Sequence, residues 1–584
     1  MLKRLLLKDP DNDRWLDFAR PRAVLLARRH DEVLPVLRAA ERAVENEGLF
    51  AAGFVCYEAA PGFDPALGTR SRGPLPLVAF GLFAEAERID APPPADDDAG
   101  ADWRFDTALP DYARQVARIR ERIGEGQTYQ VNYTIRAQAD GVDADALFRR
   151  IARDAPYGAR VELDGCEIVS GSPELFFRLD GERLLSRPMK GTAARGLTDE
   201  DDRARRTALA NSAKDRAENV MIADMIRNDM GRVARPGSVR AEALYAIEKY
   251  PTVWQATSTI SASTAAPVSD IFAAMFPCAS ITGAPKVASM ALIRELERSP
   301  RGVYTGAIGF LAPGRQATFS VAIRTALVER GGRATYGVGG GIVWDSGARA
   351  EYAECRAKAD VLRHAAPAAG FRLLETLRWD REAGFALLER HLARLAASAG
   401  YFDFRCDLAA VRRALETAVE ALPGPSCRVR LELARDGRAV VTTQALAAAA
   451  PAGPLRVRLA REPVAADDLR LFHKTSDRRV YERARAGLPD CDDVLLWNRD
   501  GLVTESTIAN LLCRFGREWV TPRVSAGLLP GTLRAELIAS GEIAERPIRV
   551  AELAGADEMQ LVNSVRGRRP CELVGENLPR AVGG

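Results

Sequence analysis

Two segments of the sequence place acidic side chains three residues apart in patterns typical of helices. In NSAKDRAENVMIADMIRND these acids are Asp215 and Glu218, among apolar residues at helical intervals. In EYAECRAKADVLR they are Glu351 and Glu354, and Lys358 follows one turn later. Residues three apart share a helix face, so each predicted helix presents a carboxylate pair. Two pairs facing one another across a cleft would hold a divalent cation such as Mg²⁺; alternatively, both are solvated faces with intrahelical ion pairs.

A single lysine, Lys190, stands in RPMKGTAARG (residues 187–196) with a proline two residues before it and a glycine directly after it. Proline restricts the backbone and glycine permits conformations that other residues avoid. An ordinary surface lysine needs neither neighbour, so we expect this cation to have a specific task.

Three further stretches favour a binding pocket. SITGAPKVASM (280–290) precedes a helix whose free N–H groups could receive an anion, and YGVGGGIVWDSG (336–347) lets the backbone approach a ligand. Arg324, in SVAIRTA, is predicted to lie inside an apolar strand, where its charge requires a carboxylate partner. Each signal also has an ordinary structural explanation, a turn or a pair within the protein. Together they favour a Mg²⁺-dependent pocket for a polycarboxylate.

The length and composition of the whole chain limit the kind of protein that carries these residues. Its 584 residues suit two to four domains, and 47% hydrophobic with 28% charged residues is typical of a globular protein. A net charge of +3 without blocks of one sign argues against a nucleic-acid partner. Nine scattered cysteines and the lack of any long apolar run predict a cytoplasmic protein that does not enter a membrane.

The elements that position these residues are predicted to be mixed α and β. Strands such as CEIVSGS and ATFSVAIRTALV alternate with helices such as KDRAENVMIADMIRNDMGRV. The Pro- and Asp-rich segment 91–102 is predicted to be a loop, and 445–454 a linker between subdomains. We place the domains at 1–364 and 371–584, joined by a linker at 365–370.

Seven segments of the first domain, taken in order, resemble the signature segments of the chorismate-utilising enzymes. They are GQTYQVNYT, GSPELFF, RPMKGTAARG, KDRAENVMIADMIRNDMGRV, SITGAPK, FSVAIRTA and GGGIVWDSGARAEYAECRAKA. The family includes anthranilate, isochorismate, salicylate and aminodeoxychorismate synthases. The resemblance implies a fold of two sheets with surrounding helices, with chorismate as the substrate.

The resemblance also implies roles for individual residues. Lys190 would attack the chorismate ring at C2, and Glu174 would protonate the departing C4 hydroxyl. The implied Mg²⁺ ligands are Glu218 and Glu354, supported by Asp215 and Glu351. The implied substrate-binding residues are Arg324, Gly283, Thr282, Gly340, Lys358 and Gln255.

Two positions bear on the nucleophile. Family members that use water carry a lysine where this chain has Gln130, whereas ammonia users carry a glutamine. Among ammonia users, anthranilate synthases resemble PIAGT and aminodeoxychorismate synthases PIKGT, and this chain reads PMKGT. Gln255 stands where relatives carry a histidine; it can donate a hydrogen bond but cannot act as an acid.

The chain contains no glutaminase signature. Its four histidines and nine cysteines include no cysteine in a Gly-rich elbow. Ammonia is therefore expected from a separate glutamine amidotransferase subunit, or from free ammonium.

The second domain resembles, again in order, the class IV (fold-type IV) pyridoxal-phosphate enzymes, which have two subdomains. The segments are ERHLARLAASAGYF, LFHKTSDRRVY, DDVLLWNRDGLVTESTIANLL, TPRVSAGLLPGTLR and LVNSVRG. The resemblance implies that Lys474 holds the cofactor, that Glu505 faces its pyridine nitrogen, and that its phosphate is bound by Arg394, Thr532, Leu533 and Ser564. It also implies a possible homodimer through this domain, although the family's first strand and turn are missing before LLETLRW.

Together, the two resemblances predict a bifunctional enzyme. The first half would aminate chorismate at C4, and the second would eliminate pyruvate from the product to give 4-aminobenzoate for folate. Two alternatives remain open. One is an anthranilate-type synthase joined to an unrelated aminotransferase, and the other is a non-catalytic second half that serves for docking.

Overall fold

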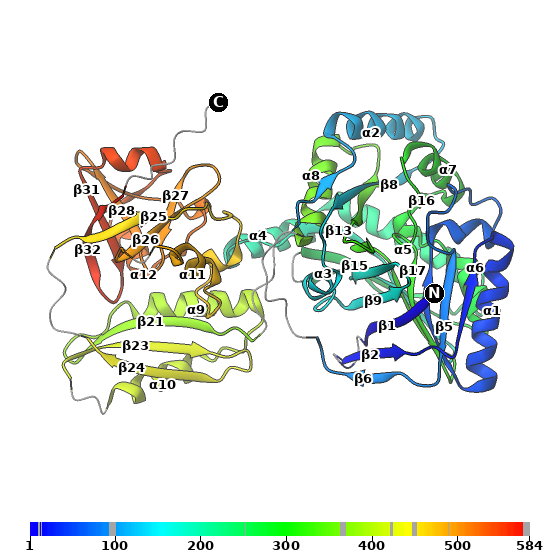
Figure 1. Ribbon diagram of the computed structural model, residues 1–584, viewed down its shortest axis with the longest axis horizontal. Helices are drawn as coiled ribbons and strands as arrows, with labels where there is room; N and C mark the ends of the chain where they lie inside the picture. The colour runs from blue at the N-terminus through cyan, green and yellow to red at the C-terminus, as the bar shows by residue number, and fades with distance from the viewer. Residues whose placement is uncertain are drawn as a thin grey trace. The chain divides into compact units, whose positions relative to one another are not determined.

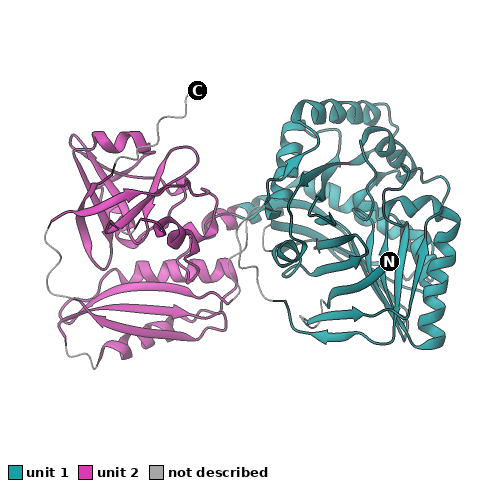
Figure 2. Ribbon diagram, in the orientation of Figure 1, with its two compact units in different colours: residues 1–195, 205–365 teal, residues 196–204, 366–584 magenta. Residues whose placement is uncertain are grey.

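The computed structural model describes residues 1–584 except 10–11, 13, 93–100, 251–252, 363–369, 421–423, 447–452, 489 and 576–584. Most of the predicted loop at 91–102, the linker at 365–370 and the subdomain linker at 445–454 therefore lies outside the described residues. The chain divides into two compact units (Figure 2). Unit 1 comprises Met1–Arg195 and Arg205–Ala365, and unit 2 comprises Gly196–Ala204 and Ala366–Gly584.

Two antiparallel sheets form the framework of unit 1. In the described residues, the first sheet has the order β16 (Gly283–Ala284), β8 (Gln130–Ala139), β20 (Ala334–Ile342), β19 (Thr325–Glu329), β10 (Cys166–Ser172), β9 (Tyr157–Leu163), β1 (Leu2–Asp9), β2 (Arg14–Ala19) and β6 (Glu87–Ile89), with β7 (Arg104–Phe105) beside β8. The second has the order β13 (Met189–Ala194), β15 (Val253–Ser263), β12 (Arg183–Arg187), β11 (Leu175–Asp180), β18 (Gln316–Val321), β17 (Ala307–Ala312), β4 (Phe50–Val55), β5 (Val78–Phe83) and β3 (Ala23–Ala27), with β14 (Arg240–Lys249) beside β15.

Apolar side chains from both sheets meet in one buried cluster. Phe18 of β2 lies with its ring centroid 5.5 Å from that of Phe83 on β5 and 5.8 Å from that of Phe310 on β17. Leu5 of β1 and Phe54 of β4 belong to the same cluster and are fully buried. Burial of this apolar surface holds the two sheets together.

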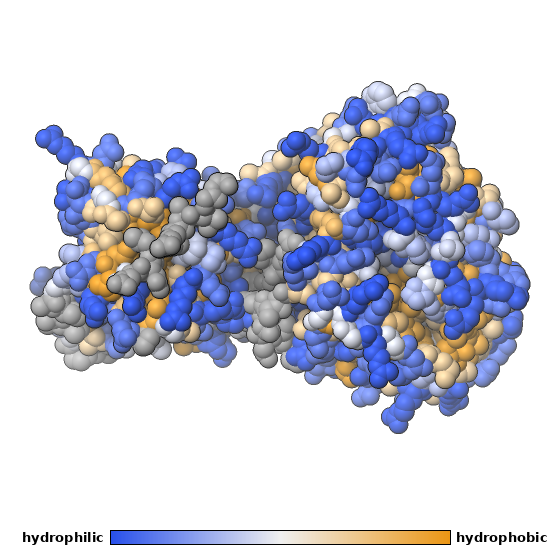
Figure 3. Space-filling model, turned by 45° about the horizontal axis from the view of Figure 1, so that its top comes forward, coloured by the Kyte–Doolittle hydropathy of each residue, from blue (hydrophilic) through white to orange (hydrophobic). Residues whose placement is uncertain are grey.

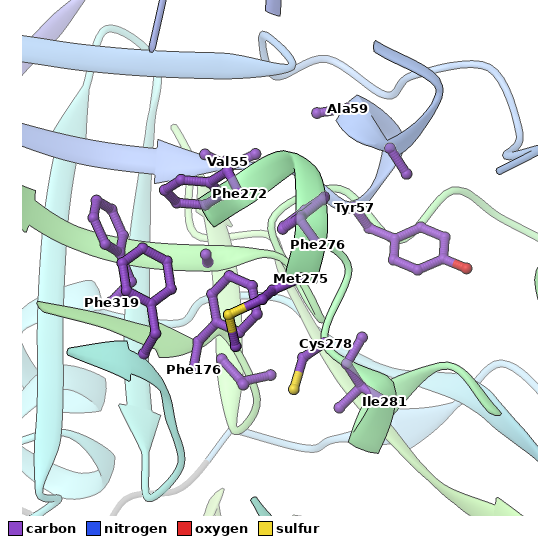
Figure 4. Packing of buried hydrophobic residues seen from close by; sticks show 14 of the residues in the cluster. Val55, Tyr57, Ala59, Phe176, Phe272, Met275, Phe276, Cys278, Ile281 and Phe319 are labelled. Atoms are coloured by element: carbon purple, nitrogen blue, oxygen red, sulfur yellow. The ribbon is translucent and has the colours of Figure 1, made fainter. Parts of the chain in front are cut away.

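Helices pack around these sheets (Figure 1). The helices of unit 1 in the described residues are α1 (His30–Glu47), α2 (Leu109–Gly124), α3 (Ala144–Ile151), α5 (Ala213–Gly231), α6 (Val268–Met275), α7 (Lys286–Leu296) and α8 (Ala348–Ala359), with short 3₁₀ turns η1 (Tyr57–Gly62), η2 (Ala279–Ile281) and η3 (Asp360–Leu362). Helix α4 (Asp199–Ala210) is divided between the units, because its residues up to Ala204 belong to unit 2. Figure 4 shows Phe272 and Met275 of α6 among Phe176 and Phe319 of the second sheet. The Phe272 and Phe319 rings meet edge to face at 4.9 Å, an arrangement that aromatic rings favour.

The described residues of unit 2 form two separate sheets. The smaller has the order β22 (Gly384–Phe385), β21 (Leu373–Asp380), β23 (Ser426–Leu433) and β24 (Ala439–Ala445). The larger has the order β27 (Val503–Ser506), β26 (Asp493–Trp497), β25 (Leu455–Leu459), β32 (Gly567–Leu573), β31 (Glu558–Asn563), β28 (Asn510–Phe515), β29 (Glu518–Thr521) and β30 (Ala544–Glu545). In the described residues of unit 2, the helices are α9 (Leu388–Phe402), α10 (Leu408–Glu420), α11 (Arg479–Arg485) and α12 (Thr532–Ala539), with 3₁₀ turns η4 (Leu469–Leu471), η5 (Val524–Ala526) and η6 (Val550–Gly555).

The predicted fold class, mixed α and β with several sheets, is confirmed. The helices predicted to carry the paired acids are α5 and α8, and CEIVSGS is strand β10. The single strand predicted for ATFSVAIRTALV was wrong. It is two strands, β18 in the second sheet and β19 in the first, and Arg324 lies between them with a left-handed φ of 51°. The apolar residues on both sides of Arg324 hid this crossing, because residues buried in either sheet look alike in sequence.

The molecular surface is a mosaic of hydrophilic and smaller hydrophobic areas (Figure 3). Among the described residues, no helix combines the length and apolar character needed to cross a bilayer.

Candidate active sites

Lys190 lies on a β-bulge at the edge of the second sheet of unit 1. Strand β13 pairs with β15 at Met189↔Thr257 and again at Thr192↔Gln255, so Lys190 and Gly191 together face the single residue Ala256. A bulge of this kind redirects side chains and is common beside active sites. Gly191 has φ +96°, and a Cβ on it would lie 3.1 Å from the Cβ of Asp215. The glycine after Lys190 is therefore required by the bulge and by the close approach of α5.

The Lys190 amine lies among charged side chains from several elements. Burial lowers its pKa, and so does the nearby cation of Lys358, whereas the carboxylates of Glu218, Glu354 and Glu174 act in the opposite direction. The net effect is a lowered pKa, which increases the fraction of neutral, nucleophilic amine.

Glu174 lies directly before β11 and is 2% exposed. The hydroxyl of Ser280 donates a hydrogen bond to its Oε1 at 2.6 Å. Burial raises the pKa of Glu174 to about 7, against the opposing effects of Ser280 and Lys190. A carboxyl group with this pKa keeps a proton to donate near neutral pH.

The predicted acids of α5 and α8 lie close enough for their charges to influence one another. Burial raises the pKa of Glu218, and the charge of Glu351 adds to that rise. Burial likewise raises the pKa of Glu351, which accepts a hydrogen bond from Ser346 at 2.7 Å. Glu354 differs, because Lys358 lies 2.7 Å from it and lowers its pKa. The Lys358 amine also donates to the carbonyl of Gly339 at 2.8 Å.

These acids fit a magnesium ion only in part. Within the described part of the chain, no three His, Cys, Asp or Glu side chains form a cluster that could hold a metal. Mg²⁺ needs only one or two carboxylates, since it keeps waters and takes substrate oxygens. Glu218 and Glu354, the two predicted ligands, both influence the Lys190 amine through their charges, so α5 and α8 each bring one of these acids to the same region. The four-residue ligand set stays a prediction.

The predicted substrate residues lie on several elements of unit 1. A Cβ on Gly340 would be 3.2 Å from Oε2 of Glu351, so the backbone there runs beside the acids. A Cβ on Gly283 would be 2.1 Å from the carbonyl oxygen of Gln130. The Thr282 hydroxyl donates to the carbonyl of Cys278 at 3.1 Å, and burial lowers the pKa of Arg324.

The structure adds residues that the sequence did not single out. A Cβ on Gly341 would lie 2.0 Å from Nε2 of Gln130 and 2.4 Å from Nζ of Lys190. Asn219 of α5 donates to the carbonyl of Lys190 at 3.0 Å, and Gln255 donates to the carbonyl of Gly191 at 2.9 Å. The only sequence signal for Asn219 was its position next to Glu218.

In unit 2, Lys474 lies between η4 and α11, and its carbonyl accepts a hydrogen bond from the backbone N–H of Leu374 at 2.8 Å. Burial lowers the pKa of Lys474 to about 8, and Arg394 adds to this effect. An amine with this pKa is partly neutral near physiological pH, as a lysine that reacts with an aldehyde must be.

Glu505 lies at the end of β27 in a network of donors. It accepts hydrogen bonds from the Tyr481 hydroxyl at 2.8 Å, the Leu529 N–H at 3.1 Å and the Asn510 amide at 3.2 Å. Burial raises its pKa to about 8. Its position in a buried, hydrogen-bonded network fits a carboxyl group that faces a pyridine nitrogen.

The predicted phosphate-binding residues are brought together around His391. Its Nε2 lies 3.0 Å from the Ser564 hydroxyl and 3.2 Å from that of Thr532, and Thr532 and Leu533 open helix α12. Two hydroxyls and a helix N-terminus suit a phosphate. Arg394 makes two hydrogen bonds to Glu375, at 2.9 and 2.7 Å, and one to the carbonyl of Pro530 at 3.2 Å. These bonds use three of its five N–H donors and leave two for a phosphate oxygen. The residues present therefore fit pyridoxal phosphate.

Two family models together match most of the chain. Residues 2–364 match the family model described as chorismate binding enzyme, and residues 372–574 match that of amino-transferase class IV. An aminodeoxychorismate synthase from Streptomyces griseus is 40% identical over 278 residues, 46% of this chain and 37% of its own length. Aminodeoxychorismate synthase component 1 from Klebsiella aerogenes is 40% identical over 267 residues, 45% of this chain and 59% of its own length.

A solved structure shares the fold of unit 1. It is anthranilate synthase component I from Streptococcus pneumoniae, 22% identical with a TM-score of 0.52, covering 62% of this chain and 92% of that protein. The match of the family model over residues 2–364, more than half of the chain, shows that the chain belongs to the family of chorismate binding enzymes.

Proposed function

We propose that this chain makes 4-aminobenzoate from chorismate in two steps. Unit 1 aminates chorismate to 4-amino-4-deoxychorismate, and unit 2 eliminates pyruvate from that compound, supplying a precursor of folate. The observation that carries the proposal is the bulged Lys190, whose pKa is lowered by burial and by Lys358, as a nucleophilic amine requires. The similarity to proteins named aminodeoxychorismate synthase supports the choice of product.

In the first step, the Lys190 amine bonds to C2 of the ring while both ring double bonds shift by one position and the C4–O bond breaks. Glu174 donates its proton to the departing hydroxyl, which leaves as water, and the raised pKa of Glu174 supports this role. Ammonia then bonds to C4 and the lysine departs from C2. Glu218 and Glu354, supported by Asp215 and Glu351, would hold Mg²⁺ on the ring carboxylate.

Gln130 supports ammonia as the nucleophile. It is 1% exposed, and among the described residues its Oε1 has no hydrogen-bond partner. A carbonyl oxygen accepts N–H donors but cannot remove a proton from water as a lysine base does. We propose that the ammonia comes from a separate glutamine amidotransferase subunit, as the name "component 1" of similar proteins suggests.

In the second step, pyridoxal phosphate supplies, when bound, a ring that withdraws electrons from the carbon bearing the amine. Lys474 would hold the cofactor and then move the proton from C4 of the substrate. Glu505 would hold a proton at the pyridine nitrogen. Thr532, Leu533, Ser564 and Arg394 would bind the phosphate. We also propose a homodimer through residues 371–584, and a cytoplasmic location, which nine free cysteines support.

A time course with chorismate, Mg²⁺, ammonium and pyridoxal phosphate, followed by liquid chromatography, tests this function. The expected result is transient 4-amino-4-deoxychorismate followed by 4-aminobenzoate and pyruvate. Formation of 2-aminobenzoate would instead support the anthranilate alternative. If unit 2 is an aminotransferase or a docking module, 4-amino-4-deoxychorismate will accumulate even with the cofactor present.

A further inference from the structure

At the bulge, the backbone carbonyls of Lys190 and Gly191 both accept hydrogen bonds from side chains. Buried carbonyls need hydrogen-bond donors, and here two side-chain amides supply them. Nδ2 of Asn219 donates to the carbonyl of Lys190 at 3.0 Å, and Nε2 of Gln255 donates to the carbonyl of Gly191 at 2.9 Å. Consecutive carbonyls of one strand are thus held from two different elements, α5 and β15.

Both amides are themselves fixed. Asn219 is 2% exposed; its Nδ2 also donates to the carbonyl of Ala256 at 3.2 Å, and its Oδ1 accepts from the Ser258 hydroxyl. Gln255 is 6% exposed, and its Oε1 accepts from the Thr192 hydroxyl at 2.9 Å. Three hydrogen bonds therefore join these amides to β13, and a fourth joins Asn219 to Ala256 of β15. The bond from the Ser258 hydroxyl is a fifth.

The identity of residue 255 matters for this arrangement. A primary amide carries its donor and its acceptor on the same carbon, so one side chain can serve two consecutive residues, Gly191 and Thr192. The two ring nitrogens of a histidine point in divergent directions and cannot do so. The Gln255 amide therefore holds Gly191 and Thr192 at once.

We propose that Asn219 and Gln255 form a clasp that fixes the bulge and so sets the direction of the Lys190 side chain. Asn219 directly follows Glu218 in α5, so the clasp also fixes the amine relative to the acidic face of that helix. Gln255 is a positioning residue that acts on chorismate through Lys190. This inference rests on the proposed function, in which Lys190 is the nucleophile.

Steady-state kinetics of amination test the clasp. Gln255→Met keeps the length of the side chain but loses the hydrogen bonds, and Gln316→Met, at an exposed position of the same sheet, is the control. Displacing a reacting group by ~1 Å costs about 100-fold. We therefore expect kcat to fall by about that factor in Gln255→Met with KM for chorismate unchanged, and no change in the control. A raised KM with unchanged kcat would mean that Gln255 binds substrate directly, which overturns the clasp.

A double-mutant cycle provides the milder second test. Thr192→Val removes only the hydrogen bond to Gln255 and should lower kcat, and Thr192→Ser should restore it. Adding Thr192→Val to Gln255→Met should have no further effect, because the two residues act as one unit. If the two effects multiply, or if Thr192→Val has the activity of the wild type, the clasp is wrong.

A third measurement does not depend on turnover. The proteins are acetylated briefly and examined by mass spectrometry, with the acetylation of Lys286 as the internal reference. Lys190 should be acetylated faster in Gln255→Met and Thr192→Val than in the wild type, because a released side chain is more accessible to the reagent. Equal reactivity in all proteins would contradict the clasp. If the wild type makes no aminated product, the proposed function fails, and this labelling still decides whether the clasp exists.

Discussion

The amide of Gln130 and the amine of Lys190 meet at one glycine. A Cβ on Gly341 would lie 2.0 Å from Nε2 of Gln130 and 2.4 Å from Nζ of Lys190. The two groups come from β8 and β13, which belong to different sheets. In the proposed reaction, the residue that receives ammonia and the residue that attacks the ring are therefore neighbours.

Gly341→Ala should separate activity from stability. The new methyl group would displace the ends of two flexible side chains rather than backbone, so the fold should persist while amination falls by about 100-fold. Gly340→Ala is the matched control. Its methyl group would lie 3.2 Å from Oε2 of Glu351, and the Lys190 amine is not among the three nearest atoms. We expect it chiefly to raise the Mg²⁺ concentration needed for half-maximal rate. Equal losses in the two variants would contradict this arrangement.

Lys190→Ala should abolish amination, with a loss of about 10⁴-fold or more, as when a nucleophile is removed. Chorismate binding, measured by calorimetry with Mg²⁺, should change little because the substrate carboxylates are held by other elements. Turnover near that of the wild type would remove the covalent role.

The pH dependence of amination should reflect two groups with opposite requirements. Glu174 must be protonated and has a pKa of about 7, so the rate should fall as pH rises through that value. Lys190 must be neutral, so the rate should also fall at lower pH, where its amine becomes charged. In Glu174→Gln the rate should be low and the alkaline decline should disappear. A decline that persists in this variant would assign it to another group.

Lys474→Ala should separate the two reactions. Without this lysine, 4-amino-4-deoxychorismate should accumulate from chorismate, and the visible absorbance of protein-bound pyridoxal phosphate should vanish. Lys190→Ala, the reciprocal control, should still convert added 4-amino-4-deoxychorismate to 4-aminobenzoate. If Lys474→Ala forms 4-aminobenzoate at the normal rate, unit 2 is not the lyase.

Glu375→Gln should destabilise unit 2. Burial alone would raise the pKa of Glu375, but Arg394 and His391 hold it at about 2, below the ordinary value of 4.5. This stabilisation is therefore present above pH 4.5 and is lost as the pH falls toward 2. Leaving Arg394 buried without its partner costs about 3–5 kcal/mol. Urea unfolding at pH 7 should show this loss, and the difference from the wild type should narrow in acid.

The sequence predicted the helices that carry the paired acids, but not the contacts between elements around Lys190. The helices of the paired acids were predictable because spacing within a helix is local. The bulge at Lys190 was not, because register depends on a partner strand more than 60 residues away in the chain. For the same reason Arg324 was placed inside one strand, and Asn219 and Tyr481 were missed, since their roles exist only through contacts between elements.

The position of the new nitrogen on the ring tests the central claim most directly. Lys474→Ala protein is incubated with chorismate, Mg²⁺ and ¹⁵N-labelled ammonium, and the product is examined by NMR. If Lys190 attacks C2, and ammonia then bonds to C4 as the lysine departs from C2, the label will be bonded to C4. Lys190→Ala introduced into the same protein will yield no labelled product. Label at C2, or labelled product from the protein without Lys190, would contradict the account.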